Sequence, residues 1–460
     1  MDEVTDFSAA ELSAIRRDFP VLEKVGRGGR PIVYLDSGAT SQKPSCVIDA
    51  EAEFYRDSNG AVHRNTHLLG DQATVQFEDA RETLAAFVGA RAGEIVWTKN
   101  ATEALNLVAT AFANASAGIL PDGSVSDLGS AHLDDPVSPL GAANPGHTRD
   151  AASRFRLGRG DRIVVTRAEH HSNLVPWQQL AAKTGASLSW LDLTPDGRID
   201  LDTLDVIDDA TKVVAFTHAS NVTGAISPVE QIVEAANRVG AITVLDTCQS
   251  SAHMPVDVGA LGVDFAVFSS HKMLGPTGIG ALWGRSELLE AMPPVLTGGS
   301  VVADVDMEAT KFLPPPAKFE AGSQPVAQAV AWAVALDYLK ELGMDRVALH
   351  EEAMTRLLLE RMAGIDGVRI LGPTDMARRL GVVAFEVEGV HPHDVGQVLD
   401  FEDVAIRVGH HCAIPLHRFF GVKASSRVTV ALTTTAEEIE QFIEGLQKVQ
   451  QYFGGASERA

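Results

Sequence analysis

The sequence predicts an α/β protein with a mostly parallel sheet flanked by helices, together with a smaller α+β domain. Three observations carry this prediction. The chain has 460 residues, more than the roughly 250–300 that usually share one hydrophobic core. From about residue 31, short apolar runs rich in β-branched residues alternate with amphipathic segments. The final third mixes helical segments with a few separate short strands. Runs that are apolar throughout are typical of parallel strands covered on both faces.

The elements of the large sheet can be placed in order along the chain. The predicted strands are 94–97, 162–166, 212–216, 241–246 and 263–269. The segments between them that have helical spacing are 102–113, 176–184 and 228–239. In open sheets of this kind, ligands bind outside the carboxyl ends of the strands. The polar residues that follow each strand are therefore the candidate site residues.

We predict two domains. Residues 31–312 form the large domain, and residues 1–30 with 313–460 form the small one. A long helix is expected from Pro325 to Leu342, ended by Gly343. Other expected features of the small domain are capping boxes at Ser8–Glu11 and Thr435–Glu438 and strands at 382–387 and 426–432.

Residues 114–154 interrupt the alternation of strands and helices. The stretch is rich in Gly, Pro, Ser, Ala and Asp and contains no Phe, Trp or Tyr. Such a composition buries little apolar surface. We predict a surface insertion that is flexible at least in part.

Composition narrows the classes of partner. Acidic residues outnumber basic ones by 61 to 38, so we expect neither nucleic acid nor a membrane as partner. The N-terminus lacks the apolar core of a signal peptide, and the longest apolar stretch, 321–336, is shorter than the roughly 20 residues that span a bilayer. Cys46, Cys248 and Cys412 have neither a disulfide nor a zinc spacing. We expect a cytoplasmic protein without a metal site of its own.

A lysine follows the strand predicted at 263–269. Lys272 lies between His271 and the glycine-rich turn 275–280, although a lone lysine is usually a solvated surface group. Asp246 ends the preceding strand, where a helix N-cap is the simpler interpretation, and Gln249 follows it. A neutral lysine amine forms a Schiff base with an aldehyde cofactor. A carboxylate beside a pyridine nitrogen keeps that nitrogen protonated.

Further polar residues follow the other strands. Ala101 and Thr102 open a helix, and free N–H groups at a helix N-terminus bind phosphate. His170 follows strand 162–166, where its ring can stack on a cofactor, and Asn221 follows strand 212–216. Several such residues at successive strand ends predict a site for pyridoxal 5'-phosphate.

Eight motifs distributed along the chain resemble those of one enzyme family. They are YLDSGATSQKP (34–44), AVHRNTH (61–67), NATEALNLV (100–108), AEHHSNLVPW (168–177), THASNVTG (217–224), SSHKMLGPTGIG (269–280), FEAGS (319–323) and RVGHHCAIPL (407–416). The chain resembles class V aminotransferase-fold enzymes of the cysteine desulfurase family, and closely their SufS-type branch. The resemblance implies a fold-type I pyridoxal-phosphate-dependent transferase.

The resemblance also implies roles for the residues at the strand ends. Lys272 is then the Schiff-base lysine, and His170 stacks on the cofactor ring. The implied ring contacts are Asp246, Gln249 and Asn221, and the implied phosphate contacts are Thr102, Ser269 and His271. The family is homodimeric, and Ser323 takes the place of a threonine that reaches the phosphate of the neighbouring subunit.

The motif RVGHHC places Cys412 after two histidines and close to Arg407. A single cysteine is commonly a buried small hydrophobe, but basic neighbours favour the nucleophilic thiolate. The resemblance places Cys412 on a mobile loop above the cofactor as the residue that forms a persulfide. Arg427 matches the arginine that pairs with the substrate carboxylate, where an ordinary ion pair is the simpler interpretation. Arg407 and His63 are expected in the same pocket.

The implied reaction converts L-cysteine to L-alanine and leaves a persulfide on Cys412, which is passed to an acceptor for iron–sulfur cluster assembly. His393 resembles a histidine that engages the zinc of a SufU-like acceptor, so we expect such an acceptor rather than a SufE-like one, together with assembly scaffold proteins; the simpler interpretation is a surface histidine. The alternatives are a selenocysteine lyase, another lyase or an aminotransferase of the same fold, and a catalytically silent scaffold.

Two positions depart from the family pattern. Lys318 replaces the arginine that precedes FEAG, which we expect to weaken one contact. The stretch that ends in LTTT (432–435) lacks an aromatic residue and an asparagine that are common there. Neither change removes a group that the implied chemistry requires.

Overall fold

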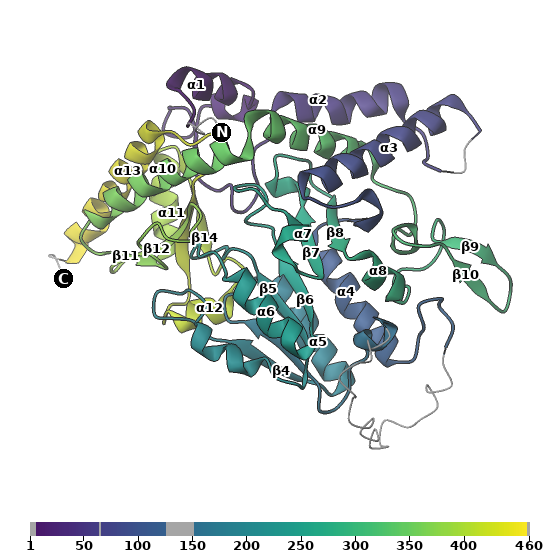
Figure 1. Ribbon diagram of the computed structural model, residues 1–460. Helices are drawn as coiled ribbons and strands as arrows, with labels where there is room; N and C mark the ends of the chain where they lie inside the picture. Colours follow the sequence, from purple (N-terminus) through teal and green to yellow (C-terminus); the bar gives the residue numbers. More distant parts are fainter. Residues whose placement is uncertain (1–5, 64–65, 126–150, 458–460) are drawn as a thin grey trace, which may run out of the picture.

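The computed structural model describes residues 6–63, 66–125 and 151–457, with side chains as far as residue 453. Its centre is a seven-stranded sheet with the order β2-β8-β7-β6-β5-β3-β4 (Figure 1). The strands are β2 (Ile95–Thr98), β3 (Arg162–Thr166), β4 (Ser187–Leu191), β5 (Thr211–Thr217), β6 (Ile242–Asp246), β7 (Phe265–Ser269) and β8 (Gly280–Gly284). Strand β8 is antiparallel to both of its neighbours, and the other pairings are parallel. The predicted mostly parallel sheet is confirmed.

Helices cover both faces of this sheet, and successive side chains of each strand point to opposite faces. Ile163 and Val165 pack in one core with α4 (Ala101–Ser116) and α5 (Val175–Thr184). Val164, between them in sequence, packs in the opposite core. That core also takes in α6 (Val229–Val239), α2 (Ser45–Glu53), α3 (Leu68–Phe87) and α9 (Val326–Leu342).

A second sheet lies in the C-terminal third. It is antiparallel, with the order β11-β12-β15-β14. Its strands are β11 (Val368–Leu371), β12 (Val382–Val387), β14 (Arg407–Gly409) and β15 (Ser425–Thr429). The helices of this region are α10 (Met344–Ala363), α11 (Pro392–Phe401), α12 (Ile414–Phe419) and α13 (Ala436–Ser457). Phe385 and Phe442 pack edge to face in the core between this sheet and α13.

Two segments pack across the predicted domain boundaries, which themselves stay a prediction. Strand β1 (Val33–Tyr34) pairs in parallel with β13 (Val404–Ala405), so Val33 joins the C-terminal core. Conversely, α9 packs on α2 and α3 beside the large sheet (Figure 1). The small hairpin of β9 (Val302–Val305) and β10 (Thr310–Phe312) projects from the body of the molecule.

The predicted capping boxes are present. Ser8 and Glu11 exchange hydrogen bonds at the start of α1 (Ala9–Arg17). Thr435 and Glu438 do the same before α13. Each pair satisfies backbone N–H groups that a helix start leaves without a partner.

The insertion predicted at about 114–154 begins no earlier than the end of α4. Helix α4 continues to Ser116, and Ala115 is buried, because its small apolar residues keep helical spacing. Residues 126–150 lie outside the described residues, so the rest of the insertion stays a prediction. Of the helices that the structure describes, none combines the length and the hydropathy needed to cross a membrane.

Candidate active site

Lys272 and Asp246 lie at the same edge of the large sheet. Asp246 is the last residue of β6, and Lys272 ends the short 3-10 turn that follows β7. These strands are parallel neighbours, with Asp246 opposite Val267. The charges of both groups act on the His170 ring. The structure therefore brings Asp246 and Lys272 to one edge of the sheet, and the roles of these residues and of His170 stay predictions.

His170 is held by its own loop. Its Nδ1 accepts the N–H of Ser172 at 3.1 Å. Burial lowers the pKa of His170 to about 4, and the positive charge of Lys272 contributes to this shift. The ring is therefore neutral at pH 7, with its Nδ1 lone pair engaged and its face available for stacking.

The groups around Lys272 fit pyridoxal phosphate. Within the described residues, the Lys272 amine makes no hydrogen bond, which leaves it available for an aldehyde. Asp246 is buried, and one of its carboxylate oxygens accepts the N–H of Cys248 at 3.0 Å. Gln249 donates to the carbonyl of Gly38 at 2.9 Å, whereas its Oε1 is buried without a partner in the described part of the chain. A buried acceptor of this kind usually has a partner, and a bound group would supply one.

The expected phosphate contacts gather at the start of α4. The N–H of Ala101 donates to the Ser269 hydroxyl at 3.0 Å, and the Thr102 hydroxyl lies 2.7 Å from that of Ser172. An added Cβ at Gly280 would lie 2.5 Å from the Asn100 Cα, so only glycine lets β8 pass this close to the helix start. The arrangement aligns the positive end of a 16-residue helix dipole with the hydroxyl groups.

His271 directly precedes Lys272 in the 3-10 turn that follows β7. Burial lowers the pKa of His271 to about 4, with further contributions from Lys272 and Lys43. Its carbonyl oxygen accepts from the Lys43 amine at 2.9 Å and the Ser41 N–H at 3.0 Å. Burial lowers the pKa of Lys43 to about 7. Sequence reasoning missed Lys43, although it lies in the quoted motif 34–44.

The loop that carries Cys412 reaches the ends of β3 and β5. Cys412 is exposed, and its carbonyl accepts the N–H of His171 at 2.7 Å. The side-chain amide of Asn221 donates to the carbonyl of His411 at 2.6 Å. These two bonds bring the predicted nucleophile to the residues that follow the strands of the cofactor site.

Arg427 is almost fully buried below this loop. One guanidinium N–H donates to the Asn221 carbonyl at 2.9 Å, and another lies 3.3 Å from Asp36. Asp36 also pairs with the more exposed Arg407 at 2.8 Å. Burial lowers the pKa of Arg427 to about 10, so the group keeps its charge at pH 7. Sequence reasoning missed Asp36, although its position within the motif 34–44 could have indicated it.

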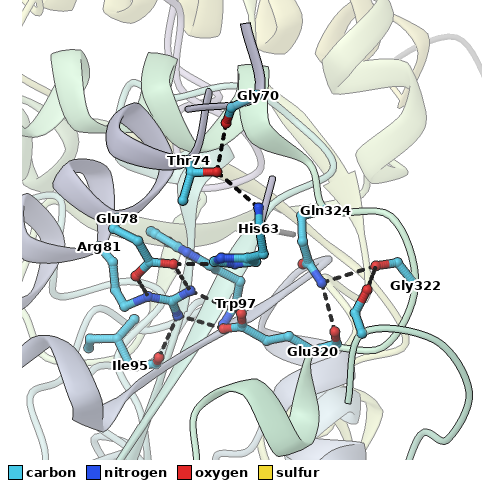
Figure 2. A network of polar contacts seen from close by, with 11 residues as sticks. His63, Gly70, Thr74, Glu78, Arg81, Ile95, Trp97, Glu320, Gly322 and Gln324 are labelled. Atoms are coloured by element: carbon cyan, nitrogen blue, oxygen red, sulfur yellow. Dashed lines mark hydrogen bonds and ion pairs between the residues drawn. The ribbon is translucent and has the colours of Figure 1, made fainter. Parts of the chain in front are cut away.

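His63 and Ser323 lie apart from Lys272. His63 is 3.6 Å from Glu78, which bonds Arg81, and Arg81 pairs with Glu320 (Figure 2). Ser323 is exposed on the loop between Glu320 and α9. In the described ranges neither side chain contacts Lys272, and their expected roles stay predictions.

His393 is exposed at the start of α11, where its N–H donates to His391 at 3.2 Å. Helix α11 packs on β14, the strand that leads to the Cys412 loop. The role of His393 stays a prediction.

Lys318 is buried and hydrogen-bonded, and whether it makes a weaker contact than the arginine of the family pattern stays a prediction. Its side chain is buried and donates to the carbonyls of Met292 at 2.8 Å and Glu290 at 3.0 Å. At the second departure from the family pattern, Thr434 is buried, and its hydroxyl accepts the N–H of Ala431 at 3.0 Å.

Comparison with known proteins places this site in a family. The family model of the class-V aminotransferases matches residues 33–125 and 149–442. A probable cysteine desulfurase of Mycobacterium leprae is 49% identical over 445 residues, which are 96% of this chain and 98% of the relative. A probable cysteine desulfurase of Streptomyces coelicolor is 45% identical over 446 residues, with the same two shares.

Solved structures agree with these relatives. The apo structure of a cysteine desulfurase from Thermococcus onnurineus has a TM-score of 0.83 at 33% identity, over 98% of this chain and 100% of that one. The cysteine desulfurase CsdA of Escherichia coli, in an S-sulfonic acid form, has a TM-score of 0.81 at 31% identity over the same shares. The chain therefore belongs to the class-V aminotransferase family, within its cysteine desulfurases, and it is a pyridoxal-phosphate enzyme.

Proposed function

We propose that this enzyme takes sulfur from free L-cysteine, releases L-alanine and carries the sulfur as a persulfide on Cys412. The observation that carries the proposal is the attachment of the exposed Cys412 loop to His171 and Asn221. This attachment supports the proposal, because His171 and Asn221 follow β3 and β5 of the same sheet whose strands β6 and β7 lead to Asp246 and Lys272. The desulfurases among the relatives support the same reaction.

Residues of this chain would divide the work as follows. Lys272 would hold the cofactor aldehyde, Asp246 and Gln249 its ring, and the start of α4 its phosphate. When bound, pyridoxal phosphate delocalises the electron pair left at the substrate Cα. Once the substrate amine has taken its place, the freed Lys272 amine would remove the Cα proton, and the neutral His170 ring would keep the stacking face free of charge.

Cys412 performs the sulfur transfer. Its thiolate attacks the substrate sulfur, so an S–S bond forms as the Cβ–S bond breaks. The electron pair stays on the carbon fragment, which takes up protons and leaves as alanine. Arg427 is expected to orient the substrate through its carboxylate, since a guanidinium binds that planar anion with two parallel hydrogen bonds.

The proposal extends to partners and location. We propose a SufU-like acceptor that meets the exposed His393, and delivery of the sulfur to iron–sulfur assembly proteins. We propose a homodimer that covers the exposed Leu68, Leu69 and Val75 of α3, near the loop of Ser323. A reducing cytoplasm is consistent with three free cysteines.

Replacing two residues separates these steps. Cys412→Ala should abolish alanine formation from cysteine while the absorbance of the bound cofactor is kept. Undiminished turnover would favour a selenocysteine lyase or another lyase of this fold. His393→Ala should weaken transfer to the acceptor protein and leave alanine release to a small thiol intact, and loss of both activities would refute the role given to His393.

A further inference from the structure

His171, on the loop that follows β3, makes two hydrogen bonds to the segment that begins at Cys412. The backbone N–H of His171 donates to the Cys412 carbonyl at 2.7 Å. The side chain of His171 accepts the N–H of Ile414, through Nε2, at 3.1 Å. Ile414 is the first residue of α12, where backbone N–H groups have no partner within the helix. His171 therefore holds the chain at Cys412 and again two residues later, where α12 begins.

The segment requires such contacts because its backbone is strained. His411 has φ 49° and Cys412 has φ 54°, so two successive residues other than glycine adopt the left-handed conformation. Side chains disfavour this region, and it persists where surrounding contacts impose it. Within the loop, the Cys412 N–H donates to His410 at 3.2 Å.

The environment of His171 favours the neutral imidazole, the form that can accept a hydrogen bond. Burial lowers the pKa of His171, and the nearby His410 adds to the shift. The two rings lie 5.6 Å apart between centroids, and the next ring, His170, lies 6.4 Å away. The neutral ring has one nitrogen lone pair, and the Ile414 contact places it on Nε2.

From this geometry we propose that His171 is a positioning residue that holds the Cys412 loop ready to attack the substrate sulfur. The proposal rests on the persulfide role proposed for Cys412.

The test compares three variants of the cofactor-loaded enzyme. His171→Leu removes the acceptor, and His171→Gln restores an oxygen at nearly the same reach. His391→Leu is the matched control, because His391 also accepts a backbone N–H, from His393 on α11. The readouts are kcat and KM for alanine formation with a small thiol, cofactor absorbance, and amide hydrogen exchange over residues 409–416.

We expect H171L to lower kcat by about tenfold, the effect of leaving one part-buried N–H unpaired, with KM and absorbance unchanged. Exchange over 409–416 should accelerate by a similar factor. H171Q should recover most of both effects, and H391L should leave both at wild-type values. His171→Asn, which is too short to reach Ile414, replaces H171L if that variant does not fold.

Three results would overturn the proposal. They are unchanged exchange over 409–416 in H171L, an equal defect in H171Q and H171L, and loss of cofactor absorbance in H171L. Failure of the proposed function would be seen in another variant, because Cys412→Ala would then still form alanine from cysteine. Amide hydrogen exchange over residues 409–416 reports whether His171 holds the loop, whether or not Cys412 forms a persulfide.

Discussion

The buried ion pair of Arg81 and Glu320 supports the loop that carries Ser323 (Figure 2). Two guanidinium N–H groups of Arg81 reach Glu320 at 2.6 and 3.0 Å, and both side chains are buried. Glu320 also accepts the N–H of Trp97 at 2.7 Å. Glu320→Gln therefore leaves a buried guanidinium whose remaining carboxylate partner in the described residues is the half-exposed Glu78.

The expected loss of stability follows from this burial. Removing one partner of a buried, hydrogen-bonded pair costs about 3–5 kcal/mol. The bond from Arg81 to Glu78 at 2.8 Å remains, so we expect the lower end, about 3 kcal/mol. The control is Glu352→Gln, which breaks an exposed ion pair with Arg356 at 2.8 Å and should cost less than about 1 kcal/mol.

Urea unfolding of the purified variants, followed by circular dichroism, measures the difference. The double variant Arg81→Met with Glu320→Leu should recover most of the loss, because it removes both buried charges together. If Glu320→Gln costs no more than Glu352→Gln, the pair does not stabilise the loop as reasoned here.

Three further predictions concern the site and its supports. Arg427→Lys should raise KM for cysteine by about tenfold or more, since lysine cannot form the paired hydrogen bonds; steady-state kinetics with an unchanged KM would contradict this. Burial raises the pKa of Glu169 to about 8, so its stabilising contribution is present at low pH and lost as the pH rises to 8. Between pH 5 and 8, Glu169→Gln should gain on the order of a few kcal/mol relative to wild type in urea unfolding, and a constant difference would refute it. Burial lowers the pKa of His218 to about 4, so stability is lost as the pH falls from 6.5 to 4, and His218→Gln should reduce this loss in the same measurement.

The fold was predictable where local pattern and burial agree. The runs at 162–166 and 382–387 are mostly apolar and rich in valine, and they form β3 and β12 over those same residues. Strand β8 escaped prediction because two glycines bound it, and β4 because it is a largely exposed edge strand. Their pairing depends on neighbours that are distant in sequence.

The candidate site was predictable at the strand ends. Parallel neighbours place Asp246 and Lys272 at one edge, and that follows from strand order alone. The hydrogen bonds and ion pairs between loops could not be predicted from strand order. His171 contacts Ile414, which is 243 residues away, and Asp36 pairs with Arg427 across 391 residues. Contacts of that kind depend on how the two sheets pack together.

The most direct test of the central claim is mass spectrometry of the enzyme after a single turnover with cysteine. We expect one added sulfur atom on the peptide that contains Cys412, none on the peptides of Cys46 and Cys248, and an amount of alanine equal to the added sulfur. Alanine formation with Cys412 unmodified, and undiminished in Cys412→Ala, would contradict it.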